Sequence, residues 1–305
     1  MTSLPPLRIA NAPCSWGVLE FEDQDAAGFP YQQVLDEIRA AGYDGTELGD
    51  WGFMPTDPAA LADELARRDL SLLGAFVPVR LADPARLAAG EAAAVRTAQL
   101  LGGAGFPDAF VVLADDIAAS PERTAVAGRV EAAHRLPDAD RVTFAANAEH
   151  IARRVRDATG LRTVFHPHCA SYIETAEEIA DLMARTDPSV LGLCLDTGHL
   201  TYAGGDPEEA ATALGTRIWH LHLKDCSPAV AARARGEGWD YHQAVRNGVF
   251  CELGSGTVRF PAVLDALART GFSGWAVVEQ DVLPALGTPF ASAVRNREYI
   301  RTLGL

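Results

Sequence analysis

The chain has 305 residues, of which 48% are hydrophobic and 22% are charged, and its formal net charge is −15 at pH 7. This composition suits one large globular domain and excludes a disordered chain, while the acidic charge disfavours nucleic acid as a partner. No apolar run is long enough to span a bilayer and no secretory signal is visible, so we expect a cytoplasmic protein without a membrane partner. The five cysteines are widely spaced and form no C-x-x-C pair, which is typical of reduced thiols.

Short segments of β character alternate along the chain with segments of helical composition. The predicted strands are Ile9–Ser15, Gly45–Gly49, Ser71–Val79, Ala109–Leu113, Arg162–His168, Leu191–Asp196, Arg217–Lys224 and Gly274–Gln280. The predicted helices are Tyr31–Ala40, Pro58–Arg68, Gly90–Leu101, Asn147–Ala158, Ala176–Arg185, Pro207–Leu214 and Pro261–Arg269. This alternation predicts an α/β fold, a single (β/α)8 TIM barrel domain spanning residues 1–305.

Two predicted connections are too long to be simple turns. One runs from Ala114 to about Ala146, after the fourth strand, and the other from Asp225 to about Phe260, after the seventh. Long loops in compact domains are uncommon unless they serve a function. Both emerge at the C-terminal mouth of the barrel, where barrel enzymes keep their chemistry, so we expect them to surround a site.

Five of the eight histidines lie between positions 166 and 222, at or just beyond the ends of predicted strands. Alternation along the fifth strand places His166 and His168 on one face. In the seventh strand the same alternation aligns His220, His222 and Lys224. His220 is the deepest of these, and we expect it to be a hydrogen-bonded residue of the barrel interior.

Carboxylates end the sixth and eighth strands at Asp196 and Glu279. Because a barrel brings consecutive strand ends around one mouth, we expect His166, Asp196, His222 and Glu279 to converge on a mixed nitrogen and oxygen metal site. Such donors suit Mn²⁺, Co²⁺, Zn²⁺ or Fe²⁺ better than Ca²⁺. A single buried histidine is more often structural, but four candidate ligands at successive strand ends favour the metal site.

Several other polar or aromatic side chains are expected at the mouth. Glu47 ends the second strand and is either a general base or substrate anchor, or a solvated carboxylate. Lys224 either holds a substrate oxygen or pairs with a carboxylate at the rim. His199, one turn after Asp196, either caps a helix or takes part in the site. Trp16 is either a wall on which a sugar stacks or a plug of the barrel.

These residues lie in motifs that resemble the xylose isomerase-like TIM-barrel superfamily, and within its sugar phosphate isomerase/epimerase family they are most similar to the inosose dehydratase branch. The motifs are Asn11–Gly17 (NAPCSWG), Tyr43–Gly49 (YDGTELG), Phe165–His168 (FHPH), Cys194–His199 (CLDTGH), His220–Asp225 (HLHLKD) and Val277–Asp281 (VVEQD). The resemblance extends through Arg233–Trp239, which adds Trp239 as a candidate substrate contact, and Phe250–Gly254.

The resemblance implies one divalent metal ion, Mn²⁺ or Co²⁺ by preference with Zn²⁺, Fe²⁺ or Mg²⁺ as alternatives, held by His166, Asp196, His222 and Glu279. Many relatives carry glutamate at the strand-five position. This chain offers only histidines there, which leaves His166 and His168 as alternative ligands.

The leading functional hypothesis is a metal-dependent lyase that dehydrates a cyclic polyol ketone or keto-sugar through an enediolate. Glu47 or His168 is the expected base, the other of the two or His199 is the acid, and Lys224 holds a substrate oxygen. The alternative is a sugar epimerase or isomerase that uses the same centre without losing water. If the protein were a non-catalytic binder, we would expect an incomplete set of metal ligands. The acidic net charge disfavours the function of the DNA-repair endonucleases. The protein could form a homodimer, with the long loops contributing to its interface.

Overall fold

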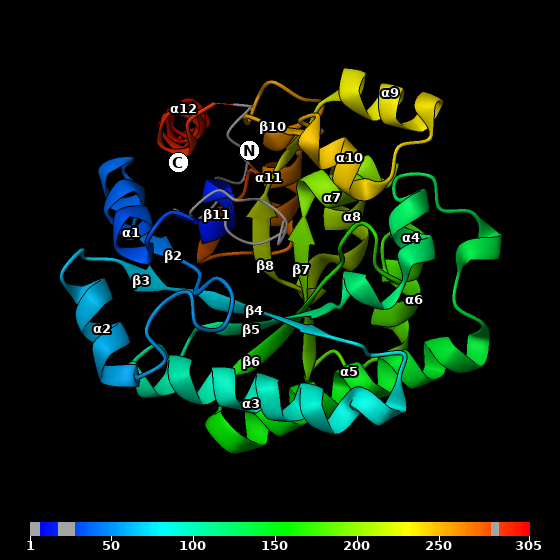
Figure 1. Cartoon of the computed structure of the whole chain (residues 1–305), viewed down its shortest axis with the longest axis horizontal. Coiled ribbons are helices and arrows are strands. Elements are labelled where there is room, and N and C mark those ends of the chain that lie inside the picture. Colours follow the sequence, from blue (N-terminus) through cyan, green and yellow to red (C-terminus); the bar gives the residue numbers. More distant parts are fainter. Residues whose placement is uncertain (1–6, 18–27, 282–286) are drawn as a thin grey trace.

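The fold is built around a parallel sheet, in a computed structural model that describes residues 7–17, 28–281 and 287–305. Its strands are β1 (Arg8–Asn11), β2 (Gly45–Thr46), β3 (Ser71–Leu72), β4 (Gly74–Val79), β5 (Phe110–Asp115), β6 (Arg162–His166), β7 (Leu191–Asp196), β8 (Ile218–Leu223) and β11 (Trp275–Val278). They pair in the order β3-β2-β1-β11-β8-β7-β6-β5-β4 (Figure 1).

The sheet closes into a barrel because its two outer strands are halves of one interrupted strand. Only Leu73 separates β3 from β4, and its backbone bridges both neighbours. The Leu73 N–H donates to the Thr46 carbonyl at 3.0 Å, and the Leu73 carbonyl accepts from the Phe110 N–H at 2.8 Å. The described strands therefore occupy the eight positions of a (β/α)8 barrel, as the alternation of segments predicts.

Helices surround the barrel on its outer side (Figure 1). The α-helices are α1 (Tyr31–Ala40), α2 (Pro58–Ala66), α3 (Leu87–Gly103), α4 (Pro121–Val126), α5 (Asp138–Thr159), α6 (Ala176–Arg185), α7 (Thr197–Tyr202), α8 (Pro207–Leu214), α9 (Pro228–Glu237), α10 (Tyr241–Arg246), α11 (Phe260–Arg269) and α12 (Pro289–Thr302). Short 3-10 helices lie at Pro13–Trp16, Pro84–Arg86, Ile117–Ala119, Ala132–His134 and Gly215–Arg217. None of these described helices combines the length and apolar character needed to cross a membrane.

The predicted strands are confirmed in number and order, with shifts at their ends. The largest concerns the first strand, which ends at Asn11 instead of Ser15 because Pro13–Trp16 forms a 3-10 helix with proline in its first turn. Helix α5 begins nine residues earlier than predicted, at Asp138 instead of Asn147. Sequence periodicity did not predict α12, whose residues 289–302 complete the helical layer.

The two long connections are folded segments and not structureless loops. The first contains α4, and the second contains α9, α10 and a two-stranded antiparallel sheet of β9 (Asp225–Cys226) and β10 (Phe250–Cys251). Their helices lie together beside the barrel mouth in Figure 1, where α10 packs against α4. Arg129 joins the two segments by donating to the carbonyls of Ala234 at 3.2 Å and Trp239 at 2.8 Å.

A buried carboxylate fixes the second segment to the end of β8. Asp225 is fully buried and accepts four backbone N–H groups, from Cys226, Gly254, Gly256 and Val258, at 2.8 to 3.0 Å. These bonds satisfy the carboxylate and hold the chain after β10 against the barrel.

A buried ion pair anchors the first segment. Arg123 on α4 makes a bidentate contact with Glu178 on α6, at 2.8 and 2.9 Å, and the two side chains are 1% and 4% exposed. Glu178 also completes the capping box of α6, since it accepts from the Thr175 N–H at 2.9 Å while its own N–H donates to Thr175 Oγ1. The Glu178 carboxylate thus both caps the start of α6 and anchors the first long segment through Arg123.

Arg123→Met leaves the Glu178 carboxylate buried without its cation, and we expect it to lower the free energy of unfolding by about 3 to 5 kcal/mol. Urea denaturation of the purified variant measures this loss. The matched control is Arg233→Met, which removes an exposed pair with Glu237 and should cost less than about 1 kcal/mol. Equal losses in both variants would contradict the role given to Arg123.

Candidate metal centre

A cavity of about 670 Å³ opens at the C-terminal mouth of the barrel. Strand ends form its floor, and both long segments contribute to its wall, the first through Asp116, Ile117 and Thr124 and the second through His242 and Arg246. The loops expected to surround a site therefore border this cavity.

Four side chains converge on the floor of the cavity. His166, Asp196, His222 and Glu279 each offer one donor atom, and these atoms all lie within 4.8 Å of one another. Asp196 Oδ2 is 3.7 Å from His166 Nε2 and 3.9 Å from His222 Nδ1, while Glu279 Oε1 is 3.2 Å from His222 Nδ1. The structure thus brings together the two imidazoles and two carboxylates that strand alternation places at the mouth.

Asp196 divides its two oxygens between the fold and the centre. As the N-cap of α7, its Oδ1 accepts the backbone N–H of His199 at 2.7 Å. Its Oδ2 is buried and, among the described residues, has no hydrogen-bond partner. The cap therefore fixes the carboxylate with one unsatisfied oxygen directed toward the imidazoles.

His222 is oriented through its other ring nitrogen. Its Nε2 lies 3.1 Å from Glu47 Oε1, and the same oxygen accepts from His220 Nε2 at 2.7 Å. Carboxylates that hold the far nitrogen of a metal-binding histidine fix its tautomer and increase its basicity. His220 is the hydrogen-bonded interior residue that we expected.

Glu47 is consequently not a solvated carboxylate. It is 3% exposed and engaged by two histidines. Although burial alone raises its pKa, His222 and His220 lower it to about 2. Its position below the centre makes it a positioning residue for His222.

Electrostatics favour a cation at the centre. Burial works against ionisation, but His166 and Lys224 lower the pKa of Asp196, and His222 and Lys224 lower that of Glu279, so both remain carboxylates. Burial holds the pKa of His166 below its usual range and keeps that imidazole neutral. A neutral imidazole, a second imidazole with Nδ1 lacking a hydrogen bond, and two carboxylates match the donors that bind divalent transition metals.

Lys224 lies beside the four donor side chains, next to Glu279. Its Nζ is 3.3 Å from Glu279 Oε2, 3.2 Å from Asp281 Oδ2 and 3.5 Å from His199 Nε2. Burial lowers its pKa, but the carboxylates of Asp281 and Glu279 outweigh this effect, and the pKa lies well above its usual range. Gly198 makes room for this side chain, since a Cβ there would lie 2.5 Å from Lys224 Cγ.

His168 stands apart from the four donors. Its Nδ1 donates to the Cys169 carbonyl at 2.6 Å, and its Nε2 lies 3.5 Å from the Tyr241 hydroxyl. Its ring centroid is 4.0 Å from that of His199. Both rings line the cavity, so the geometry selects His166 as the strand-five donor and leaves His168 facing the space for a substrate.

The two tryptophans do not line the cavity. Trp16 is 2% exposed, and its indole N–H donates to Glu37 on α1 at 2.6 Å. Trp239 follows α9. Its indole N–H donates to Glu237, and the Arg233 guanidinium stacks on its ring. The expected stacking wall is therefore wrong for Trp16, because the 3-10 helix after β1 turns its ring into the helical layer. Trp239 is not among the described residues that line the cavity.

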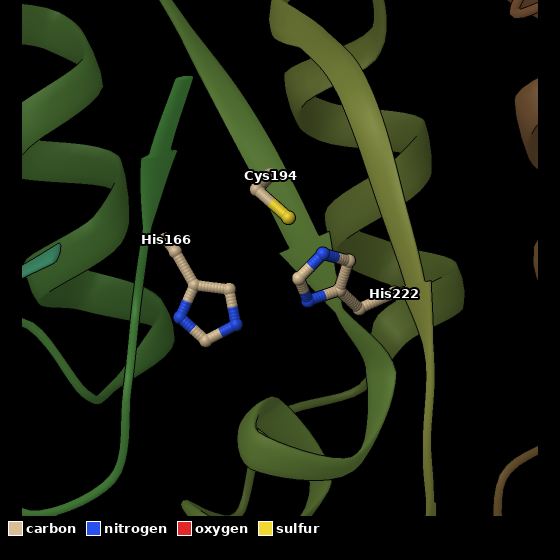
Figure 2. A group of neighbouring side chains, drawn as sticks. All are labelled: His166, Cys194 and His222. Atoms are coloured by element: carbon tan, nitrogen blue, oxygen red, sulfur yellow. The ribbon is translucent and has the colours of Figure 1, made fainter. Parts of the chain in front are cut away.

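Two other groupings of donor atoms share the histidines of the centre. Glu47, His220 and His222 form one, in which Glu47 Oε1 lies within hydrogen-bond distance of the Nε2 atoms of both histidines. His166, Cys194 and His222 form the other, and Figure 2 shows the Cys194 sulfur on the same side of the barrel as both imidazoles. Burial raises the pKa of the Cys194 thiol to about 12, so it adds no charge to the centre.

Sequence patterns missed three contributors to this region. Asp281 lies beyond the last strand, and only the alternation from Glu279 signals it. Tyr241 belongs to α10, whose place over the mouth no local pattern indicates. Cys194 shares the inward face of β7 with Asp196, but a cysteine in an apolar run looks like an ordinary core residue.

Comparison with known proteins places this geometry in a family. A sequence model described as "Xylose isomerase-like TIM barrel" matches residues 35–303. The chain belongs to this family. It is 32% identical to the inosose dehydratase of Geobacillus kaustophilus, over 98% of this chain and 95% of that protein.

Solved structures with the xylose isomerase-like fold agree with the barrel. An L-ribulose 3-epimerase superposes with a TM-score of 0.68 at 18% identity, covering 98% of this chain and 94% of the other. The IOLI protein, solved with a bound zinc atom, superposes with a TM-score of 0.70 at 14% identity, covering 97% and 98% of the two chains. At 18% and 14% identity, these superpositions establish a shared fold and do not by themselves establish a shared function.

Glu47→Gln removes the charge that holds His222 and leaves the volume of the side chain nearly unchanged. We expect the affinity for Mn²⁺ to fall about 10- to 100-fold, as is usual when such an outer partner is lost. Titration calorimetry gives the affinity, and circular dichroism checks the fold. Glu237→Gln, at an exposed helix end, is the control, and unchanged Mn²⁺ affinity in Glu47→Gln would refute the positioning role.

Metal binding should release protons near neutral pH. Burial lowers the pKa of His222, but the carboxylates of Glu279 and Glu47 raise it well above its usual range. The apo imidazole therefore carries a proton that must leave before Nδ1 coordinates, and we expect about one proton per ion at pH 7 and weaker binding as the pH falls. Calorimetry in buffers of different ionisation enthalpy counts the protons. A heat independent of the buffer would contradict this expectation.

Proposed function

We propose that the chain is a divalent-metal-dependent hydro-lyase that removes water from a cyclic polyol ketone or keto-sugar. The convergence of His166, Asp196, His222 and Glu279 on the cavity floor carries this proposal. The inosose dehydratases among its relatives support the reaction class and suggest 2-keto-myo-inositol as the reference substrate. The zinc in the IOLI protein supports a metal in this type of barrel, and we favour Mn²⁺ or Co²⁺ here, with Zn²⁺, Fe²⁺ and Mg²⁺ as alternatives.

The charges around the cavity favour a neutral substrate. Its described lining includes two basic residues, Lys224 and Arg246, and Lys224 is already paired with two carboxylates. The acidic lining residues are more numerous: Glu47, Asp50, Asp115, Asp116, Glu279 and Asp281. A phosphate or carboxylate group would meet this negative surface, whereas the hydroxyl groups of a polyol donate hydrogen bonds to it.

When bound, the ion would draw electrons from a ketone oxygen and a neighbouring hydroxyl and so make the intervening C–H acidic. His168 is the group that we assign to remove this proton. Its Nδ1–H donates to the Cys169 carbonyl, which leaves Nε2 as the basic nitrogen on the cavity side. The proton on Nε2 then leaves with the departing hydroxide as water.

Lys224 supplies a fixed positive charge next to this chemistry. Its raised pKa keeps the ammonium protonated, so it stabilises the negative charge on a substrate oxygen and does not act as a base. His199 contacts both His168 and Lys224 and has a pKa well below its usual range through burial and the neighbouring His168. It therefore positions the two groups as a neutral partner.

A second candidate function is epimerisation or isomerisation of a keto-sugar. The same proton removal followed by return of the proton to carbon gives this outcome without water loss, and the L-ribulose 3-epimerase fold shows that such enzymes share this barrel. Incubation of the protein with inososes and keto-hexoses in the presence of Mn²⁺ or Co²⁺, followed by mass spectrometry, separates the two. Loss of one water identifies the lyase, an isomer of unchanged mass identifies the alternative, and no turnover of any of them contradicts both.

His168→Asn removes the basic nitrogen and preserves a hydrogen-bonding side chain of similar reach. We expect kcat to fall about 10²- to 10⁴-fold, the usual contribution of general acid–base catalysis, while the Mn²⁺ content stays at the wild-type level. Steady-state kinetics and metal analysis on the same preparation test both parts. His150→Asn, on the outer face of α5, should retain wild-type turnover. Full activity of His168→Asn would exclude it as the base.

A further inference from the structure

Cys194 lies immediately beneath the candidate centre. It precedes Asp196 by two residues on β7, so both side chains point into the barrel, with Cys194 one layer deeper. Its side chain is fully buried. In Figure 2 the sulfur is directed toward the space between the imidazole rings of His166 and His222.

Its sulfur is close enough to join the donors of the centre. One donor atom each from His166, Cys194 and His222 lies within 4.8 Å of the other two. Both imidazoles are 2% exposed, and His222 has an Nδ1 without a hydrogen bond among the described residues. The two imidazoles therefore belong to two overlapping donor sets, one completed by carboxylates on the mouth side and one by sulfur on the interior side.

The two donor sets suit different ions. Carboxylate oxygens suit Mn²⁺ and Mg²⁺, whereas a thiolate selects softer ions such as Zn²⁺, and imidazole serves both classes. An ion held by Asp196 and Glu279 has no chemical reason to recruit sulfur if it is hard. A soft ion at the same imidazoles gains a bond by moving toward Cys194.

We propose that Cys194 is a conditional ligand, which binds thiophilic divalent cations such as Cd²⁺, Co²⁺ and Zn²⁺ together with His166 and His222 but leaves Mn²⁺ to the carboxylates. The inference rests on the metal centre of the proposed function and adds a second, deeper ion position to it. As the metal–sulfur bond forms, the S–H bond breaks and its proton passes to the solvent buffer. No oxidant or reductant takes part.

Cobalt substitution tests the sulfur bond directly. We expect the Co²⁺ form of the wild-type protein to show a sulfur-to-metal charge-transfer band in the near ultraviolet, and Cys194→Ser and Cys194→Ala to lack it. Cys14→Ser and Cys169→Ser are the matched controls. Cys14 lines the cavity, and Cys169 is buried with its thiol 3.2 Å from the His199 carbonyl, yet neither belongs to the donor set and both variants should keep the band.

Affinities provide the second readout. Cys194→Ser should weaken Cd²⁺ binding by at least about tenfold, since a direct ligand contributes no less than an outer partner does, while its Mn²⁺ affinity stays unchanged. Retained Mn²⁺ affinity also shows that the variant is folded. Absence of the band in the wild-type protein, or equal Cd²⁺ affinity with and without Cys194, overturns the inference. If Mn²⁺ fails to bind the wild-type protein, the proposed centre itself is wrong, whereas Mn²⁺ binding without sulfur ligation rejects Cys194 alone.

Discussion

Two carboxylates share a buried pocket at the end of the barrel, and their mutual repulsion is the constraint on which the site depends. Asp196 and Glu279 are 3% and 8% exposed, and burying a carboxylate costs several kcal/mol unless positive charge and hydrogen bonds compensate it. Lys224 and His222 supply part of this compensation. A divalent cation between the two carboxylates would add to it, and this is the physical basis of the metal site that we propose.

Two side chains of the centre, Asp196 and His222, and the neighbouring Lys224 are each held or accommodated by a contact that belongs to the fold. Asp196 caps α7, Glu47 holds His222, and Gly198 gives Lys224 its space. The chain after β8 is fixed by the four N–H groups that Asp225 accepts. Groups held in this way need little reorganisation when charge develops in a substrate, which is the main source of electrostatic catalysis.

Strand periodicity predicted the barrel and the four converging donors because both follow from local rules. Alternation decides which side chains face inward, and a parallel barrel brings all strand ends to one mouth. The choice between His166 and His168 required coordinates, since both satisfy that alternation. The contacts of Glu47 with two histidines also required coordinates, because these partners are more than 170 residues away in the sequence. Trp16 was misplaced because the turn after β1 decides its direction, and β character alone does not reveal that turn.

Diffraction from crystals grown with Mn²⁺, with anomalous data collected at the manganese absorption edge, tests the central claim most directly. The account predicts one anomalous peak within bonding distance of His166 Nε2, Asp196 Oδ2, His222 Nδ1 and Glu279 Oε1. A peak elsewhere, or none at this position in crystals that contain the ion, would contradict it.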